Sequence, residues 1–156
     1  MSILSTTIAA AITAVAPPND APAIDHALYA MRIVESNNNP DAVGDEGKAI
    51  GMYQIHRNYW LDGLRFTPSI GGEYGDCFDP EYAEKIVRSN LGGYCTKRRL
   101  GREPTVFDFL RMHNGGPKAH KATGKKRKNL DVYSAKCVKV YPFLKTMFDP
   151  YKEVLK

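Results

Sequence analysis

The stretch that decides the fold is Glu35-Ser36-Asn37-Asn38-Asn39-Pro40, followed by Gly44-Asp45-Glu46-Gly47-Lys48-Ala49-Ile50-Gly51-Met52-Tyr53-Gln54-Ile55. Apolar residues recur at helical spacing just before it, at Ile24, Ala27, Leu28, Met31 and Val34. The asparagines and Pro40 favour a turn, so the helix should end near Glu35. The glycine-punctuated residues 42–50 predict a short β-hairpin. The sequence therefore predicts a helix that ends in a carboxylate beside a hairpin with further carboxylates.

Outward from this stretch the pattern is mostly helical. The expected elements are a helical turn or short helix at 52–60, a loop at 69–79, a helix at 80–91, a short helix at 106–112, a turn at 113–117, a basic loop at 118–128 and a last helix at 130–141. Pro80 suits a first helical position, and Thr105 with Asp108 resembles a capping box. This order predicts an α+β fold, mostly helical, with a small β-hairpin after the first core helix.

The composition indicates one globular domain with a basic surface. The chain has 156 residues and a formal charge of +5, which favours an anionic partner such as a bacterial wall polymer, nucleic acid or an acidic surface. Basic residues cluster at 97–102 and 118–128. These clusters lack the interleaved aromatic residues of a single-strand platform, so we expect no specific nucleic-acid partner.

The N-terminal residues have a composition of their own. Ile3 to Ala16 is small and apolar, Ala14-Val15-Ala16 has the form of a signal cleavage site, and residues 17–22 read as a linker. We therefore expect an N-terminal arm or a signal and linker at 1–22, and the globular domain at 23–156. The apolar run is too short to cross a bilayer, so no transmembrane segment is predicted.

Three cysteines, Cys77, Cys95 and Cys137, are too few for a dense disulfide framework. The odd number leaves at least one thiol free or paired between chains. No C-x-x-C or His/Cys cluster is present, so neither a structural zinc site nor another metal site is expected.

Glu35 is the first candidate for chemistry. A glutamate at the end of an apolar helix should be partly desolvated, which raises a carboxyl pKa and suits a general acid. A second carboxylate is available from Asp41, Asp45 or Glu46, although acids beside glycine are also ordinary turn residues. Carboxyl groups about 5–5.5 Å apart serve a retaining glycosidase, and about 6.5–9.5 Å an inverting one.

Two further segments are candidates to line a cleft. Tyr53 and Gln54 of the segment 51–55, and His113, Asn114 and Gly115 further along, offer flat surfaces and two-sided hydrogen bonding that sugars need. Core packing is the alternative for Tyr53, and a purely structural turn is the alternative for His113 and Gly115.

Three blocks together resemble one family. They are Glu35-Ser36 with Gly51-Met52-Tyr53-Gln54-Ile55 and Tyr59-Trp60, then Gly71-Gly72-Glu73-Tyr74-Gly75-Asp76-Cys77, then Phe107-Asp108-Phe109-Leu110-Arg111-Met112-His113-Asn114-Gly115-Gly116-Pro117. Their order and spacing resemble the invertebrate-type lysozymes, or destabilases, of the lysozyme superfamily. The resemblance covers about 27–141.

The resemblance implies a lysozyme-like fold for 23–156 and a muramidase, which hydrolyses the β-1,4 bond between N-acetylmuramic acid and N-acetylglucosamine in peptidoglycan. Glu35 matches the family's general acid and Asp45 is the nearest match to its aspartate, with Glu46 left open by a one-residue uncertainty in register. No cofactor or metal is implied, and wall degradation implies an antimicrobial role. An isopeptidase side activity, reported in the family, would need a serine or cysteine nucleophile.

Two departures from the family pattern affect where the protein works. The family is usually rich in disulfides, and here Ile50 replaces the cysteine beside the Gly-x-x-Gln-Ile motif. Few cysteines indicate a reducing compartment, a microbe, or a virus or phage whose enzyme is not secreted in the ordinary way. For a protein that acts on a cell wall, we expect secretion or association with a virion or phage rather than a resident cytoplasmic enzyme. Two alternatives stay open, namely a lytic transglycosylase that uses Glu35 alone, and a non-catalytic lysozyme-like subunit of a larger particle.

Overall fold

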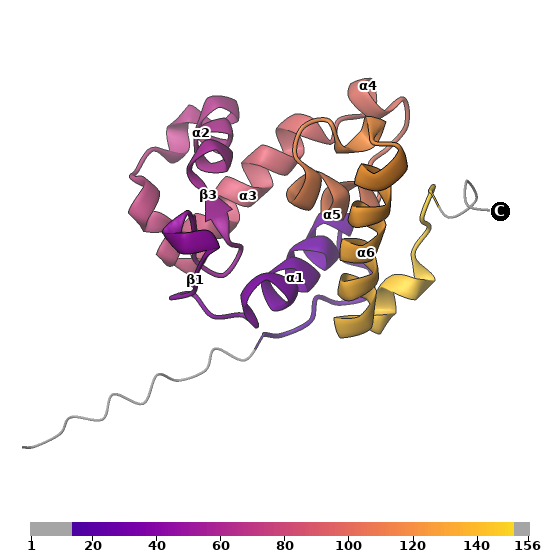
Figure 1. Ribbon diagram of the computed structural model, residues 1–156, viewed down its shortest axis with the longest axis horizontal. Helices are drawn as coiled ribbons and strands as arrows, with labels where there is room; N and C mark the ends of the chain where they lie inside the picture. Colours follow the sequence, from indigo (N-terminus) through magenta and orange to yellow (C-terminus); the bar gives the residue numbers. More distant parts are fainter. Residues whose placement is uncertain (1–13, 152–156) are drawn as a thin grey trace, which may run out of the picture.

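The computed structural model describes residues 14–151, and six helices and a small sheet make up most of them (Figure 1). The helices are α1 Ala23–Ser36, α2 Arg57–Phe66, α3 Pro80–Tyr94, α4 Lys97–Leu100, α5 Val106–Gly115 and α6 Gly124–Val140. The strands are β1 Val43–Gly44, β2 Ala49–Ile50 and β3 Ile55–His56. Short 3₁₀ turns lie at η1 Asp45–Gly47, η2 Pro68–Ile70, η3 Tyr74–Phe78, η4 Ala119–Lys121 and η5 Pro142–Thr146. The predicted α+β class, mostly helical, is confirmed.

Helix α1 ends where the asparagines predicted. Asn37 and Asn38 both adopt left-handed backbone conformations, with φ of 54° and 62°, which asparagine tolerates better than most residues. Their amides donate to the carbonyls of Ile33 and Arg32 and so satisfy the last turn of the helix. The chain therefore leaves α1 directly after Glu35 and Ser36.

The predicted hairpin is present, but it belongs to a sheet of three strands. Strands β1 and β2 are antiparallel with Val43 opposite Ile50, and β2 pairs antiparallel with β3, placing Ile50 opposite Ile55. The helical turn expected from Met52 is wrong, because 51–54 turn back to form β3 and α2 begins only at Arg57. A buried Ile50–Ile55 pair stabilises the third strand.

Gly51 allows the hairpin to approach the η3 turn. Its φ is 71°, and a Cβ atom there would lie 2.1 Å from the carbonyl oxygen of Cys77. Only glycine fits such a position without movement of the backbone. The contact holds the sheet against the rest of the domain without a disulfide.

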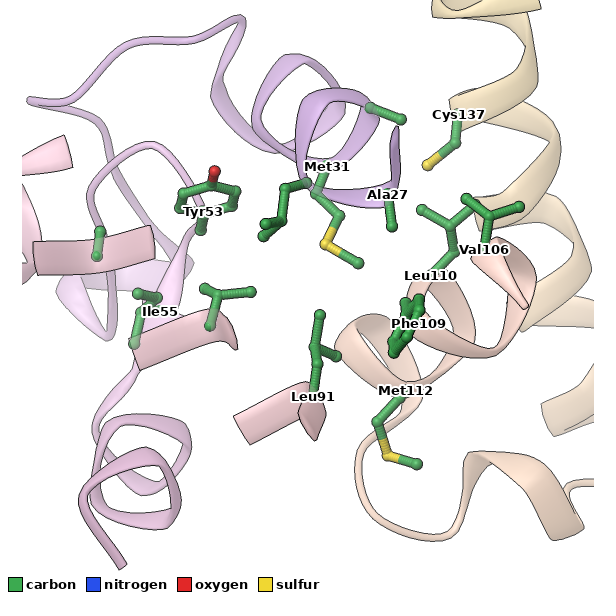
Figure 2. Packing of buried hydrophobic residues seen from close by; sticks show 14 of the residues in the cluster. Ala27, Met31, Tyr53, Ile55, Leu91, Val106, Phe109, Leu110, Met112 and Cys137 are labelled. Carbon is green, nitrogen blue, oxygen red and sulfur yellow. The ribbon is translucent and has the colours of Figure 1, made fainter. Parts of the chain in front are cut away.

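Helix α1 lies at the centre of the core. Its Ala27 and Met31 face Leu110 of α5 and Cys137 of α6, while Leu91 of α3 approaches from another side (Figure 2). All five side chains are fully buried. Because α1 is covered on several sides, the direction of its C-terminal carboxylate is fixed by the surrounding helices.

Three helix boundaries differ from the predictions. Helix α3 continues through Gly92-Gly93, because Gly93 faces the ring of Phe66, where a Cβ would lie only 2.3 Å away. Helix α5 continues through the predicted turn to Gly115, whose missing side chain makes room for Leu130. Helix α6 begins at Gly124, so the second half of the predicted basic loop is helical. The predicted capping box of Thr105 and Asp108 is confirmed.

The predicted N-terminal arm is only partly covered, since residues 1–13 lie outside the described residues. Within 14–151 the structure contains no helix of the length and apolarity needed to cross a membrane.

Candidate active site

Glu35 occupies the last turn of α1 and points between α5 and α6. The hydroxyl of Tyr133, on α6, donates a 2.7 Å hydrogen bond to Oε1 of Glu35. Nε2 of His113, on α5, lies 3.5 Å from the same oxygen. The Glu35 side chain is 21% exposed, so it is mostly buried yet open on one side.

His113 connects Glu35 to a fourth helix. Its side chain is only 5% exposed, and its Nδ1 shares a 3.2 Å hydrogen bond with the hydroxyl of Tyr59, on α2. Tyr133, Glu35, His113 and Tyr59 thus form one chain of polar groups supplied by α6, α1, α5 and α2. A chain of this kind fixes the orientation of each member and couples their charges.

The surroundings of Glu35 alter its pKa in a way that the sequence did not predict. Burial raises the pKa, but the hydrogen bond and charge of His113, the hydroxyl of Tyr133 and the charge of Lys136 outweigh it. The net pKa of Glu35 lies below its ordinary value, so the expected raised pKa is wrong for the free protein. The sequence could show the apolar helix but not the histidine opposite.

A cavity of about 320 Å³ opens beside Glu35. Its lining comprises Glu35, Asp45, Ala49, Gln54, His56, Tyr59, His113 and Asn114. Besides Glu35, this cavity therefore contains four residues that the sequence predicts to be catalytic or sugar-binding. They are Asp45, Gln54, His113 and Asn114.

Among the three candidates for the second carboxylate, only Asp45 lines this cavity. Its carboxylate lies 3.6 Å from Nε2 of His56 and its side chain is 56% exposed. Glu46 is 88% exposed and pairs with Lys48 instead. Asp45 and Glu46 both have positive φ, at 47° and 54°, so the hairpin tip holds them in a costly backbone conformation of the kind found at functional sites.

Gln54, from the sheet region, and Asn114, from α5, both line the cavity. The Gln54 side chain donates to the carbonyls of Gly51 and Ala42, at 2.9 Å and 3.3 Å. These bonds fix its orientation within the hairpin. Asn114 is exposed near the end of α5, so its amide is free to face a ligand in the cavity.

The structure does not bring Tyr53 or Gly115 to the cavity. Tyr53 is completely buried and its hydroxyl donates to Glu84 of α3, at 3.4 Å. Gly115 faces Leu130 in the packing between α5 and α6. Both proposed sugar contacts are therefore corrected to structural roles, since packing between elements decides both positions.

Two functional candidates, Tyr59 and Tyr133, escaped the sequence reasoning. In the sequence, Tyr59 lies in a family block that gives it no role, and Tyr133 fits the apolar face of the last helix. Burial raises the pKa of both phenols well above the ordinary value. They therefore stay protonated and act as hydrogen-bonding groups.

The cysteines offer no nucleophile. All three thiols are free and buried in the described structure, and burial raises the pKa of Cys137 to about 12. The described lining of the cavity includes no serine or cysteine. Nearby Ser36 donates to the carbonyls of Arg32 and Met52, which ties it to the backbone.

Comparison with known proteins agrees with this arrangement. The sequence model of the Destabilase family matches residues 25–137, from α1 into α6. The chain belongs to the destabilase family. The mostly helical fold with a small sheet is consistent with the lysozyme-like fold expected of a destabilase.

Lysozyme 1 of Crassostrea virginica is similar to part of this destabilase. The two are 33% identical over 69 residues, which are 44% of this chain and 34% of that lysozyme. The match thus spans about a third of the relative's length.

Proposed function

We propose that this chain is a lysozyme-type glycosidase that hydrolyses the β-1,4 bond between N-acetylmuramic acid and N-acetylglucosamine in peptidoglycan. The observation that carries the proposal is that Glu35 and Asp45 line one cavity, one on a rigid helix and the other on a hairpin. Two carboxylates that flank the scissile bond are the arrangement that most glycoside hydrolases use. Destabilase membership and the partial similarity to Lysozyme 1 support it.

Glu35 acts as the general acid. In the free protein its low pKa keeps it ionised at neutral pH, with His113 and Tyr133 as its partners. A glycan chain that fills the cavity removes water from Glu35 and His113. Because burial disfavours an ionised carboxylate, this desolvation raises the pKa of Glu35, which then takes up a proton. Glu35 then donates this proton to the glycosidic oxygen as the bond breaks.

Asp45 supplies the second carboxylate. It either forms a glycosyl intermediate or stabilises the oxocarbenium-like transition state, and Glu35 then removes a proton from the attacking water. Gln54 and Asn114 hydrogen-bond to the sugar hydroxyl and N-acetyl groups. Tyr59 holds His113 in place through its hydroxyl.

The test is clearing of a peptidoglycan suspension by the purified protein and by Glu35→Gln. We expect the variant to lose at least a hundredfold in rate, as removal of a general acid does. Glu46→Gln is the matched control, because Glu46 is a neighbouring carboxylate, next to Asp45, that does not line the cavity. This variant should clear at the normal rate. Equal clearing by Glu35→Gln and the unaltered protein would reject the proposal.

A lytic transglycosylase is the second candidate. It is favoured by the contrast between Glu35, which is mostly buried in a polar network, and Asp45, whose side chain is mainly exposed with His56 as its partner. A transglycosylase needs only Glu35 and releases an anhydro-sugar. Mass spectrometry of the digest separates the two reactions, since hydrolysis leaves a reducing muramic acid end, and Asp45→Asn should abolish hydrolysis but largely spare transglycosylation.

A further inference from the structure

Two basic segments that are far apart in the sequence lie side by side. The guanidinium of Arg99, on α4, donates a hydrogen bond to the carbonyl of Pro117, next to η4. Figure 1 shows α4 beside the turns that lead into α6. The two basic clusters of the sequence therefore contribute to one surface.

We call this surface the basic face and define it by six exposed side chains, Arg98, Arg99, Lys118, Lys121, Lys125 and Lys126. No carboxylate of residues 14–151 pairs with any of these six cations. Neighbouring cations behave differently, since Lys97 pairs with Glu103 and Arg127 pairs with Asp131. The basic face thus holds six charges that the described part of the protein leaves unneutralised.

The start of α6 concentrates this charge further. Lys125 and Lys126 lie in its first turn, where no acidic residue is present and the N-cap Thr123 makes no side-chain cap bond. Cations at a helix N-terminus interact unfavourably with the helix dipole. An anionic ligand on the basic face would relieve both the dipole and the repulsion among the cations.

The basic face also adjoins the candidate active site. Asn114 lines the cavity, and Lys118 follows it by four residues, a span of at most roughly 14 Å. A ligand on the basic face is therefore close enough to be joined covalently to a glycan chain in the cavity.

We propose that the basic face binds a phosphodiester-linked polyol polymer attached to the wall glycan, next to the strand that is cleaved. Repeating phosphates match the row of cations, as they do in other polyanion complexes. No Phe, Tyr or Trp lies among residues 97–102 or 118–126, and the ring of His120 is only partly exposed, which disfavours single-stranded nucleic acid. The inference rests on the proposed function for its glycan, and it adds a second site that selects walls carrying such polymers.

The test measures binding to insoluble wall sacculi by co-sedimentation, with every protein carrying Glu35→Gln so that the wall stays intact. One batch of sacculi keeps its phosphodiester polymer, and hydrofluoric acid removes the polymer from the other. We expect at least tenfold tighter binding to the intact batch. The stripped batch still carries stem-peptide carboxylates, so it separates phosphate binding from general attraction to anions.

The variant Lys121→Glu/Lys125→Glu/Lys126→Glu should bind intact sacculi at least tenfold more weakly, with little change on stripped sacculi. The matched control Lys85→Glu/Lys139→Glu/Lys145→Glu changes the net charge equally on exposed residues elsewhere and should stay within twofold. The corresponding glutamine variants repeat the comparison if the reversals unfold the protein. Neutralising three contacts should also lower the salt slope of log Kd by about 2.

Three outcomes would overturn the inference. They are equal binding to intact and stripped sacculi, equal binding by the basic-face and control variants, and tighter binding to duplex DNA than to intact sacculi. Clearing of stripped sacculi is assayed separately with Glu35 restored, and it should be unchanged by the basic-face substitutions. Absence of clearing by every protein that carries Glu35 would reject the proposed function. The co-sedimentation result would still test whether the basic face binds the polymer.

Discussion

The Tyr133 hydroxyl lies 2.7 Å from Oε1 of Glu35, although the two residues are 98 positions apart in the chain. A neutral donor at this distance stabilises the ionised carboxylate more than the protonated carboxyl group. Tyr133 therefore belongs to the machinery that sets when Glu35 holds its proton.

Replacing Tyr133 by phenylalanine tests this assignment. The substitution keeps the ring in the core but removes the donor, so the pKa of Glu35 should rise. Since Glu35 must be protonated to act as an acid, the alkaline limb of the activity profile should move to higher pH. The profile of kcat/KM against pH gives the measurement, because it reports the pKa values of the free enzyme. An unchanged alkaline limb in a folded variant would contradict the role.

Replacing His113 by glutamine should have a larger effect. His113 lowers the pKa of Glu35 more than Tyr133 does, through both its hydrogen bond and its charge. The alkaline limb should shift further than in Tyr133→Phe. In addition, kcat should fall by at least about tenfold, because the variant lacks the imidazole that holds the Glu35 carboxyl group in place. Tyr59→Phe is the control that keeps His113 and removes only its hydroxyl partner.

Acid should destabilise the fold through Asp108. Burial raises the pKa of Asp108, but the two hydrogen bonds from Arg102, at 2.7 Å and 3.0 Å, and those from Thr105 and Tyr151 lower it more. The net folded pKa lies below the unfolded value of about 3.9. Its stabilisation is therefore present above about pH 4 and is lost as the pH falls through the folded pKa.

Asp108→Asn should consequently cost about 2 kcal/mol at pH 7, because it removes hydrogen bonds to a charged group. The difference from the unaltered protein should shrink at low pH. Urea unfolding at pH 7 and near pH 3 gives the comparison. Asp41→Asn, on an exposed side chain, should cost little at either pH, and a constant deficit for Asp108→Asn would argue against the linkage.

Gly51→Ala should damage the hairpin far more than Gly47→Ala. Both glycines have positive φ, 71° and 87°, but only at Gly51 would the new Cβ meet a backbone oxygen, at 2.1 Å. Gly47→Ala should cost about 1 kcal/mol of backbone strain, and Gly51→Ala several times that, with a parallel loss of activity as Asp45 moves. Thermal unfolding and clearing assays measure both, and equal losses would show that the close approach to Cys77 is unimportant.

The sequence predicted the elements around Glu35 well because their signals are local. Turn-forming asparagines, an N-terminal proline and a capping box act within four residues, and the ends of α1 and the starts of α3 and α5 were correct. The predicted ends of α3 and α5 were wrong. Gly93 and Gly115 lie inside these helices, where they allow close contacts with Phe66 and Leu130. A contact with an element far away in the sequence cannot be predicted from local secondary-structure propensity.

In the candidate site, too, features with a local sequence signal were predicted and features that depend on distant contacts were not. Glu35, Asp45, Gln54, His113 and Asn114 carried recognisable motifs and all line the cavity. The direction of the Glu35 pKa shift was missed because it depends on which side chains lie opposite. Tyr53 was misplaced because its motif position gives no information about which face of the hairpin is buried.

Glu35 and its three polar partners come from four helices, and the last of them along the chain, Tyr133, lies on α6. During synthesis α1 and the hairpin leave the ribosome well before α6, which begins at Gly124. Until then Glu35 has no Tyr133, and α1 lacks the cover that holds its end in place. Bringing residues so far apart in the chain together carries a loop-closure entropy cost that local helix formation does not. Catalytic competence should therefore appear as the final event of folding.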